Sequence, residues 1–512
     1  MKELTKVQIE TRQFPSENKN KVEDLDLGIS QFYLCPDKAE MSSDGIGGAI
    51  ITWDDDRNAD CDIYAQRVNS MGNTLWSTNG KAICTANKGQ HQPEICSDGV
   101  GGAIIIWLDS RAGLNSYDWE IYAQRVNSSG DIQWINNGIP ICTVSGSKTS
   151  LRIFSDGTGG AIIVWVDARS TNSGIYAQRV NSLGEIQWMM NGVPICTAPE
   201  YKGTIQICSD GIDGAIITWQ DEWSGNRDIY AQRINSSGDV LWNINGVAVC
   251  VENDYQGFPE ICDDGSNGAI ITWRDQRSGP SHIYAQRVNS SGKTQWTDNG
   301  VVISIASDIQ TDQQICSDGF NGAFITWHTW VIDASEESNV YAQRINASGK
   351  VQWIANGVPI CTAIEGQVEP QIIGDGAGSS IITWLDRRDG SAYYDLDIYA
   401  QRVDYNGVIQ WVTDGELICT AKSSKVRIIR DVSEGAIILW QDERYEKPSI
   451  YAQRINSNGD VQWSANGVAI RTYGRNIFNL IPGFNLFFQF SIFSIVIIII
   501  IKKIEKSSRY KL

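Results

Sequence analysis

The sequence predicts an all-β fold, an eight-bladed β-propeller of four-stranded antiparallel blades, followed by a single C-terminal transmembrane helix. First, a Tyr-Ala-Gln-Arg motif recurs eight times at intervals of 52 to 58 residues, at Tyr64, Tyr122, Tyr176, Tyr230, Tyr284, Tyr341, Tyr399 and Tyr451. Second, each copy contains four short β-prone segments bounded by turn residues, which fits a propeller blade. Third, an uncharged apolar segment near the C-terminus has the length of a membrane span.

The second repeat shows the expected strands in order. PEICSDG (93–99) is strand A, GGAIIIWLD (101–109) is strand B, EIYAQRVNSSG (120–130) is strand C and DIQWINNGIPIC (131–142) is strand D. Each is rich in Ile, Val, Tyr or Trp, and the glycines between them suit tight hairpin turns. We expect each blade to be one contiguous repeat, from a strand A at 40–43 to a strand D at 461–470, with blade 1 packed against blade 8.

Sixteen of the 19 tryptophans occupy two fixed positions per repeat, one on strand B and one on strand D. The motif tyrosine and the strand D tryptophan are 12 residues apart in every copy, as in Tyr64 and Trp76. A constant hairpin length indicates a structural role. We therefore expect these rings to fill the space between neighbouring blades.

The C–D hairpin resembles the blades of eight-bladed quinoprotein-type propellers, because a turn glycine is followed four residues later by tryptophan (Gly130 and Trp134). The longer pattern SDGxGGAIITWxDxR…DIYAQRVNSxGxxQW, which covers almost all of residues 38–474, resembles a repeat of predicted prokaryotic cell-surface proteins. That resemblance implies a secreted or surface-displayed β-propeller without an assigned reaction.

Three regions follow from composition. Residues 1–37 form a polar N-terminal segment without an apolar signal-peptide core, 38–474 the propeller, and 475–512 a membrane helix at about 484–501 with a basic tail of net charge +4. Because positive flanks stay in the cytoplasm, we expect a single-pass protein with the propeller outside the cell. The alternative is a tail-anchored protein with a cytosolic propeller.

Charge and cysteine usage limit the partners. The total of −18 leaves −22 on residues 1–475, which disfavours a nucleic-acid partner. Such a surface attracts Ca²⁺, yet no motif indicates a Ca²⁺ site, so we expect no cofactor. Most of the 12 cysteines fall at the ends of strands A and D, beyond disulfide reach of each other, and Cys35 and Cys61 alone lie outside that pattern.

Two regularities indicate scaffold polar contacts. We expect the arginine of the recurring motif to pair with the aspartate that follows the strand B tryptophan by two residues. The position two residues before the strand A cysteine is polar in every copy, and since strand A lines a propeller's axis, we expect a polar ring around a channel. Its members are Glu40, Glu94, Arg152, Gln206, Glu260, Gln314, Gln371 and Arg427.

Function is sought where the copies differ. The B–C connection is lengthened in repeats 2, 6 and 7, and those loops combine aromatic rings with carboxylates, which is typical of binding surfaces. The candidate ligand-binding rim comprises Tyr117, Trp119, Glu120, Trp330, Asp333, Tyr393, Tyr394 and Asp395. The alternative is that these loops only fill space.

No catalytic motif is present, and eight equal copies offer no pair of carboxylates with separated pKa values. The three histidines, His91, His282 and His328, map to the variable face, where His282 and His328 could approach each other, but further metal ligands are not evident. We therefore expect a membrane-anchored, non-catalytic binding or adhesion module for a protein or carbohydrate partner. The alternatives are a propeller enzyme of the quinoprotein or lyase type and a structural surface-layer spacer.

Overall fold

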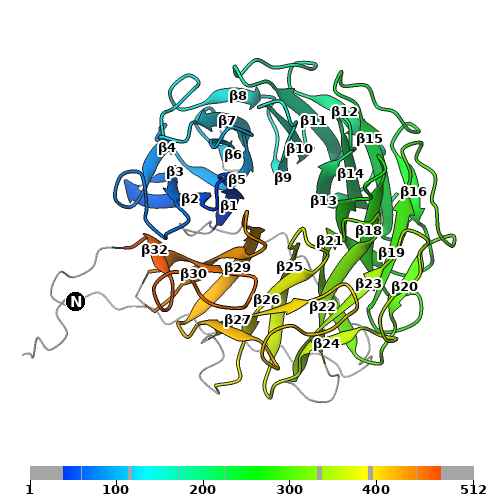
Figure 1. Cartoon of the computed structure of the whole chain (residues 1–512). Helices are drawn as coiled ribbons and strands as arrows, with labels where there is room; N and C mark the ends of the chain where they lie inside the picture. Colours follow the sequence, from blue (N-terminus) through cyan, green and yellow to red (C-terminus); the bar gives the residue numbers. More distant parts are fainter. Residues whose placement is uncertain are drawn as a thin grey trace, which may run out of the picture. The chain divides into compact units, whose positions relative to one another are not determined.

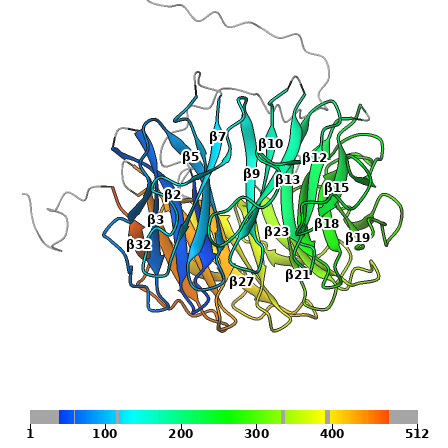
Figure 2. The same ribbon diagram turned by 90° about the horizontal axis from the view of Figure 1, so that it is seen from above.

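The computed structural model describes residues 38–58, 60–113, 118–170, 172–223, 225–330, 337–389, 396–444 and 447–473. Within them the chain forms eight separate four-stranded antiparallel sheets arranged as a ring. The prediction of an eight-bladed propeller is confirmed. Figure 1 looks along the axis, with the first strand of each blade innermost, and Figure 2 shows the ring from the side.

Each blade is one contiguous repeat whose strands follow one another outward. Blade 1 contains β1 (Ala39–Ser43), β2 (Ala49–Asn58), β3 (Asp60–Val68) and β4 (Lys81–Cys84), and blade 2 contains β5 (Gln90–Ser97), β6 (Ala103–Asp109), β7 (Glu120–Val126) and β8 (Ile139–Cys142). Blade 3 contains β9 (Lys148–Ser155), β10 (Ala161–Asp167), β11 (Gly174–Val180) and β12 (Val193–Cys196), and blade 4 contains β13 (Lys202–Ser209), β14 (Ala215–Asp221), β15 (Asp228–Ile234) and β16 (Val247–Cys250).

The second half of the ring repeats this order. Blade 5 contains β17 (Gln256–Asp263), β18 (Ala269–Asp275), β19 (His282–Val288) and β20 (Val301–Ser304), and blade 6 contains β21 (Ile309–Ser317), β22 (Ala323–Trp330), β23 (Ser338–Ile345) and β24 (Val358–Cys361). Blade 7 contains β25 (Gln367–Gly374), β26 (Ser380–Asp386), β27 (Asp397–Val403) and β28 (Glu416–Cys419), and blade 8 contains β29 (Ser423–Arg430), β30 (Ala436–Asp442), β31 (Ser449–Ile455) and β32 (Val468–Arg471).

The outermost strands are shorter than we predicted. Each has four residues, and the preceding tryptophan segment pairs with strand C only through an isolated bridge such as Val126 with Ile132. The chain turns there because Asn137 and Gly138 both adopt positive φ. The second set of tryptophans therefore lies beside the strand and is free to reach the next blade.

The tryptophans pack as core residues. The strand B rings are fully buried and stack on the motif tyrosine of their own blade, with centroids 6.3 to 6.5 Å apart. Each outer tryptophan donates its indole N–H across the blade boundary to a carbonyl in the next C–D turn at 3.0 to 3.2 Å, as Trp76 does to Ser128. We call this contact the interblade latch.

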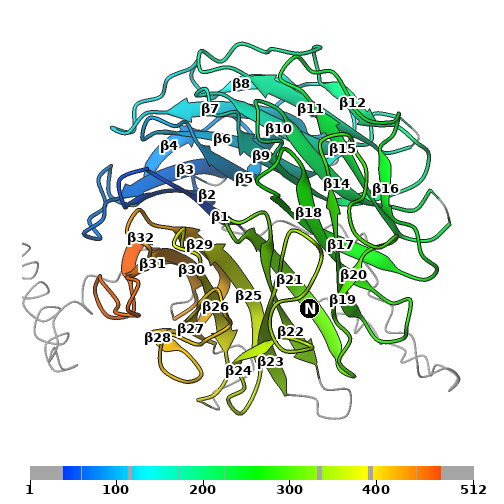
Figure 3. The same cartoon turned by 45° about the vertical axis from the view of Figure 1, so that its right-hand side comes forward.

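The ring closes between its first and last blades. Met41, Trp53 and Tyr64 share one apolar cluster with Leu439 and Ile470, and Figure 3 shows β1 beside β29. The latch also spans this boundary, since Trp463 donates to the Ser70 carbonyl at 3.0 Å. The predicted packing of blade 1 against blade 8 is confirmed.

The arginine pairing differs from our prediction. The motif arginine bonds the aspartate of the A–B turn in its own blade, at 2.6 to 2.9 Å in all eight copies, as Arg67 does Asp44. The strand B aspartate instead accepts from its tryptophan N–H and, in six blades, from an arginine two residues later, as Asp109 does from Trp107 and Arg111. The arginine pairs with the A–B turn aspartate because backbone N–H groups of the turn already hold that carboxylate beside the arginine.

The repeat cysteines are free thiols, ten in all among the described residues, so the expectation that Cys84 and Cys96 do not bond is confirmed. Cys61 is disulfide-bonded, and Cys35 lies outside the described residues. Among the described residues, no helix combines the length and the hydropathy of a membrane span. The predicted span at 484–501, its basic tail and residues 1–37 all fall outside the described part of the chain.

Candidate functional site

The predicted polar ring lies at the axis as a chain of side-chain contacts between neighbouring blades. On one side, Arg427 reaches Glu40 at 3.2 Å, although 387 residues separate them in sequence. Glu94 accepts from Lys38 at 2.6 Å and from Arg152 at 3.2 Å. These contacts make the ring a tertiary feature that no single repeat contains.

The ring continues through neutral groups on the other side. Arg152 donates to the Gln206 amide oxygen at 3.0 Å, and Gln206 in turn donates to the Glu260 carboxyl at 2.8 Å. Gln314 hydrogen-bonds the same carboxyl from blade 6. The two sides of the axis therefore differ: salt bridges join blades 8 to 3, whereas hydrogen bonds through amides and the Glu260 carboxyl join blades 3 to 6.

A β-bulge interrupts the innermost strand of blades 2 to 8, where the register with the second strand shifts. One non-glycine residue in each bulge adopts a positive φ of 45° to 54°, a conformation that costs free energy and is concentrated at functional sites. These residues are Gln92, Ser150, Thr204, Phe258, Asp312, Glu369 and Lys425.

The bulge residues differ chemically from blade to blade, whereas most of the repeat is uniform. All seven line one of two axial cavities. Both cavities lie toward the strand ends that carry the variable B–C and D–A loops, since Gln90 pairs with Asp109 at the start of a B–C loop. None of these bulge residues was predicted from the sequence as part of a site. The signal in the sequence was a strand A position that carries seven different residue types in blades 2 to 8.

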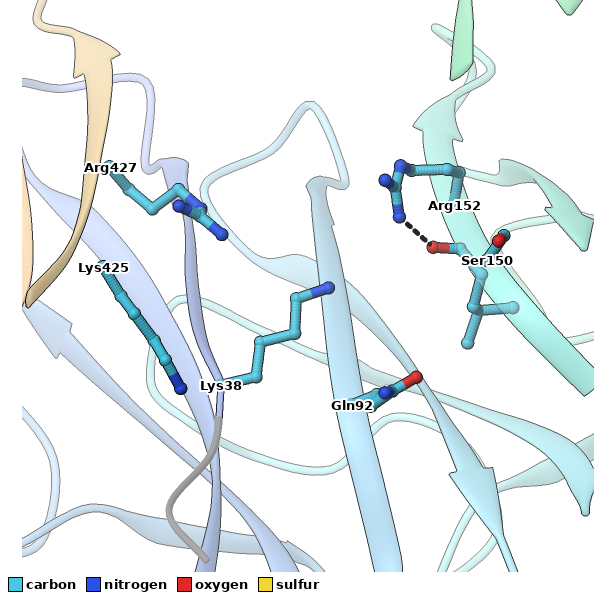
Figure 4. Close-up of a pocket in the computed structure, with 7 residues that line it drawn as sticks. Lys38, Gln92, Ser150, Arg152, Lys425 and Arg427 are labelled. Carbon is cyan, nitrogen blue, oxygen red and sulfur yellow. Dashed lines mark hydrogen bonds between the residues drawn. The ribbon is translucent and has the colours of Figure 1, made fainter. Parts of the chain in front are cut away.

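The first cavity, of about 390 Å³, is basic. Its polar lining comprises Lys38, Gln92, Ser150, Arg152, Lys425 and Arg427. In Figure 4 the four cationic side chains extend from the strands on both sides toward the space between them. Three of these cations pair with the carboxylates of Glu40 and Glu94. Four cations against two carboxylates leave a local excess of two positive charges in a chain of net charge −18, which favours an anionic ligand.

The second cavity, of about 210 Å³, lies on the opposite side of the axis and is acidic. Its lining comprises Thr204, Phe258, Glu260, Asp312, Gln313, Gln314, Glu369 and Gln371. Phe258 is 37% exposed and places an aromatic face beside the polar groups. The two cavities together give the axial mouth two chemically distinct halves.

The pKa values of two carboxyl groups at the same repeat position, Glu40 and Glu260, shift in opposite directions. Burial alone would raise the pKa of Glu40, but Arg427 and Lys38 outweigh it and hold the pKa below its usual range. At the same repeat position in blade 5, burial raises the pKa of Glu260 to about 7 despite the more distant Arg152 and Arg427. Near neutral pH one carboxyl is thus ionised while the other retains a proton for part of the time.

The structure describes only three of the eight predicted rim residues, Trp119, Glu120 and Trp330. Trp119 and Trp330 are half-buried and pack edge-on against histidines, His91 at 5.4 Å and His328 at 5.7 Å between ring centroids. Trp330 ends β22 and so belongs to a strand, not to a loop as we had expected. Glu120 begins β7, at the predicted start of strand C, and is buried. Tyr117, Asp333, Tyr393, Tyr394 and Asp395 lie outside the described residues.

The histidines have separate surroundings. His282 contacts Ser278 at 3.1 Å, and the buried His328 lies 3.5 Å from Asp312. Burial lowers the pKa of His328 to about 4, so its ring is neutral near pH 7. No group of three or more His, Cys, Asp or Glu side chains arranged for a metal ion occurs in the described part of the chain.

No family model and no curated protein matches the chain. Among solved structures it is similar to a polysaccharide lyase, an ulvan lyase bound to a GlcA–Rha3S unit, with 9% identity over 83% of this chain and 92% of that chain and a TM-score of 0.46. It is also similar to a eukaryotic initiation factor (8% identity, 85% and 91% covered, TM-score 0.43) and to an α-L-arabinanase of Penicillium chrysogenum (11%, 69% and 90%, TM-score 0.37). At these values the similarity concerns the fold and assigns no reaction.

The expectation of a non-enzyme requires correction. The ulvan lyase and the arabinanase are enzymes with similar folds. The physical reason given for that expectation also fails, because eight similar repeats do not produce eight equal sites. The pKa values of Glu40 and Glu260, at equivalent positions, shift in opposite directions.

Proposed function

We propose that the protein is a carbohydrate-active propeller whose axial mouth binds an acidic oligosaccharide, one that carries carboxylate or sulfate groups. The observation that carries this proposal is the basic cavity of about 390 Å³. Its guanidinium and ammonium groups suit carboxylates and sulfates, and Gln92 and Ser150 offer hydrogen bonds to sugar hydroxyls. The ulvan lyase was solved with a ligand of this class.

Catalysis at the same mouth is the second candidate, and the two halves of the mouth favour it. Cations beside a uronate carboxylate stabilise the negative charge that develops when the neighbouring C–H loses its proton. Glu260, with a pKa of about 7, is suited to give a proton to a departing glycosidic oxygen. In a lyase-type elimination a carboxylate lining the acidic cavity, such as Asp312, would take the proton from that C–H bond while Glu260 protonates the leaving oxygen. Ultraviolet absorbance of the unsaturated product would reveal the reaction.

Binding is tested by titration calorimetry of the full chain in detergent with galacturonic acid hexamers and with the same hexamers after reduction of their carboxyl groups. We expect binding of the acidic hexamer that weakens as salt rises. Replacing Lys425 by Gln should weaken it about 10-fold, the worth of one charge-assisted hydrogen bond. Lys293→Gln, in an exposed C–D turn at the other end of the blades, is the matched control. Equal affinity for acidic and reduced hexamers would refute the proposal.

We further infer that the propeller is displayed on a cell surface by a membrane helix at 484–501. The uncharged apolar sequence and the basic residues after it support this placement. The disulfide-bonded state of Cys61 also supports it, since disulfides persist in oxidising compartments. Protease protection of tagged termini in intact cells would distinguish an external from a cytosolic propeller.

A further inference from the structure

Blade 4 departs from the repeat at a position that faces the variable side. In six blades an arginine two residues after the strand B aspartate stacks on the motif tyrosine, with its guanidinium carbon 3.7 to 4.7 Å from the ring centroid. In blade 4 this residue is Trp223. Its backbone N–H still bonds Asp221 at 2.8 Å, but its side chain is 50% exposed.

A second exposed aromatic residue, Tyr201, bonds through its backbone to the residue before Trp223. The backbone N–H of Glu222 donates to the Tyr201 carbonyl at 3.2 Å, and the Tyr201 side chain is 43% exposed. Glu222 also accepts from Arg227 at 2.7 Å. Arg227 in turn lies over the ring of Tyr255 in blade 5, 5.2 Å from its centroid.

These contacts continue to the axis. The rings of Tyr255 and Phe258 are 6.4 Å apart, and Arg274 lies 4.6 Å from the Phe258 centroid. Phe258 is the bulge residue that lines the acidic axial cavity. Side-chain contacts therefore link Arg227, Tyr255, Phe258 and Arg274 from the rim of blades 4 and 5 to the axial mouth. The exposed Tyr201 and Trp223 adjoin this row at the rim through Glu222, which bonds both Tyr201 and Arg227. These six residues are here called the aromatic strip.

Exposed aromatic rings are costly in water unless a partner covers them. Flat rings offer large, rigid contact areas to the C–H faces of sugars. The cavities of about 390 and 210 Å³ are too small for a polymer, so a bound glycan chain must leave the mouth across the surface. The strip is a surface of this composition that begins at the mouth.

We propose that the aromatic strip binds further sugar units of the acidic glycan whose terminal units occupy the axial mouth, so that the protein selects polymers over short oligosaccharides. This inference rests on the proposed function and adds a direction and a length preference to it. In this proposal Trp223, Tyr201 and Phe258 position the glycan chain and add to its binding affinity, and no chemical step is involved.

The experiment compares dimers, trimers and octamers of galacturonic acid as ligands of the full chain in detergent. We expect the wild type to bind octamers at least 10-fold more tightly than trimers. The double variant Tyr201→Ala/Trp223→Ala should lose that preference and leave trimer affinity unchanged. Phe320→Ala removes a 60% exposed ring from an A–B turn, at the other end of the blades, and should alter neither.

The outcomes separate the two proposals. If the wild type binds trimers and octamers equally, or if the double variant keeps the octamer preference, the strip is refuted and the axial site stands. If the wild type binds none of these acidic ligands, both proposals are wrong. A thermal unfolding midpoint within about 2 °C of the wild type shows that the variant is folded, as expected for substitutions of exposed side chains.

Discussion

Replacement of Glu260 by Gln tests the electrostatics of the axial ring. Gln has the shape of the protonated carboxyl and retains groups that can bond Gln206, which lies 2.8 Å away. Burial raises the pKa of Glu260 from 4.5 to about 7. The native protein therefore binds this proton more tightly than the unfolded chain does.

The sign of the effect follows from that difference. Where the native state holds more protons, the free energy of unfolding falls as pH rises. The contribution of Glu260 is complete below about pH 4.5 and is lost as pH rises to about 7, a change of about 3 kcal/mol at most. Gln carries no such proton, so the variant should gain up to about 3 kcal/mol relative to the wild type over that range.

Urea unfolding of both proteins at a series of pH values measures this difference. Other titrating groups contribute equally to both proteins, so only the difference between the two curves matters. Glu185→Gln, in an exposed C–D turn, is the control and should show no such trend. A difference that stays constant between about pH 4.5 and 7, or that changes in the opposite direction, would refute the account of the ring.

Three further predictions concern the scaffold. Gly130→Ala should destabilise the protein by about 1–3 kcal/mol more than Gly99→Ala in urea unfolding. Both glycines have positive φ, but only at Gly130 would the new Cβ lie 2.9 Å from the Trp76 ring. Equal losses of stability in the two variants would contradict the packing of the interblade latch. Asp98→Ala should cost about 3 kcal/mol, since Asp98 accepts from two turn N–H groups and from Arg125; a loss below about 1 kcal/mol would make the pair dispensable. Burial raises the pKa of the Cys250 thiol to about 12, so maleimide should label it only after unfolding, and rapid native labelling would argue against its burial.

The scaffold could be predicted from the sequence because its determinants are local. The period of the motif fixed the number of blades, and the turn glycines and the tryptophans on strand B gave the hairpins and their core. The four-residue outer strands were missed because a β-rich composition does not reveal the turn at Asn137 and Gly138, where positive φ ends the pairing. The arginine partner was missed because only the strand B aspartate was considered. The aspartate of the A–B turn recurs in every repeat as well, and only the folded turn shows that it lies beside the arginine.

The candidate site could not be predicted from the sequence because closure of the eight-bladed ring brings its residues together. The sequence showed that the axial position is polar in every repeat, but it could not show which repeats would face each other or how unequal their surroundings would be. Arg427 meets Glu40 only because blade 8 closes on blade 1, and Phe258 reaches the mouth only because a bulge turns its side chain. Strand patterns are set by neighbours in sequence, whereas the charges and cavities at the axis are set by groups one or more repeats apart. Only the closed tertiary structure brings those groups together.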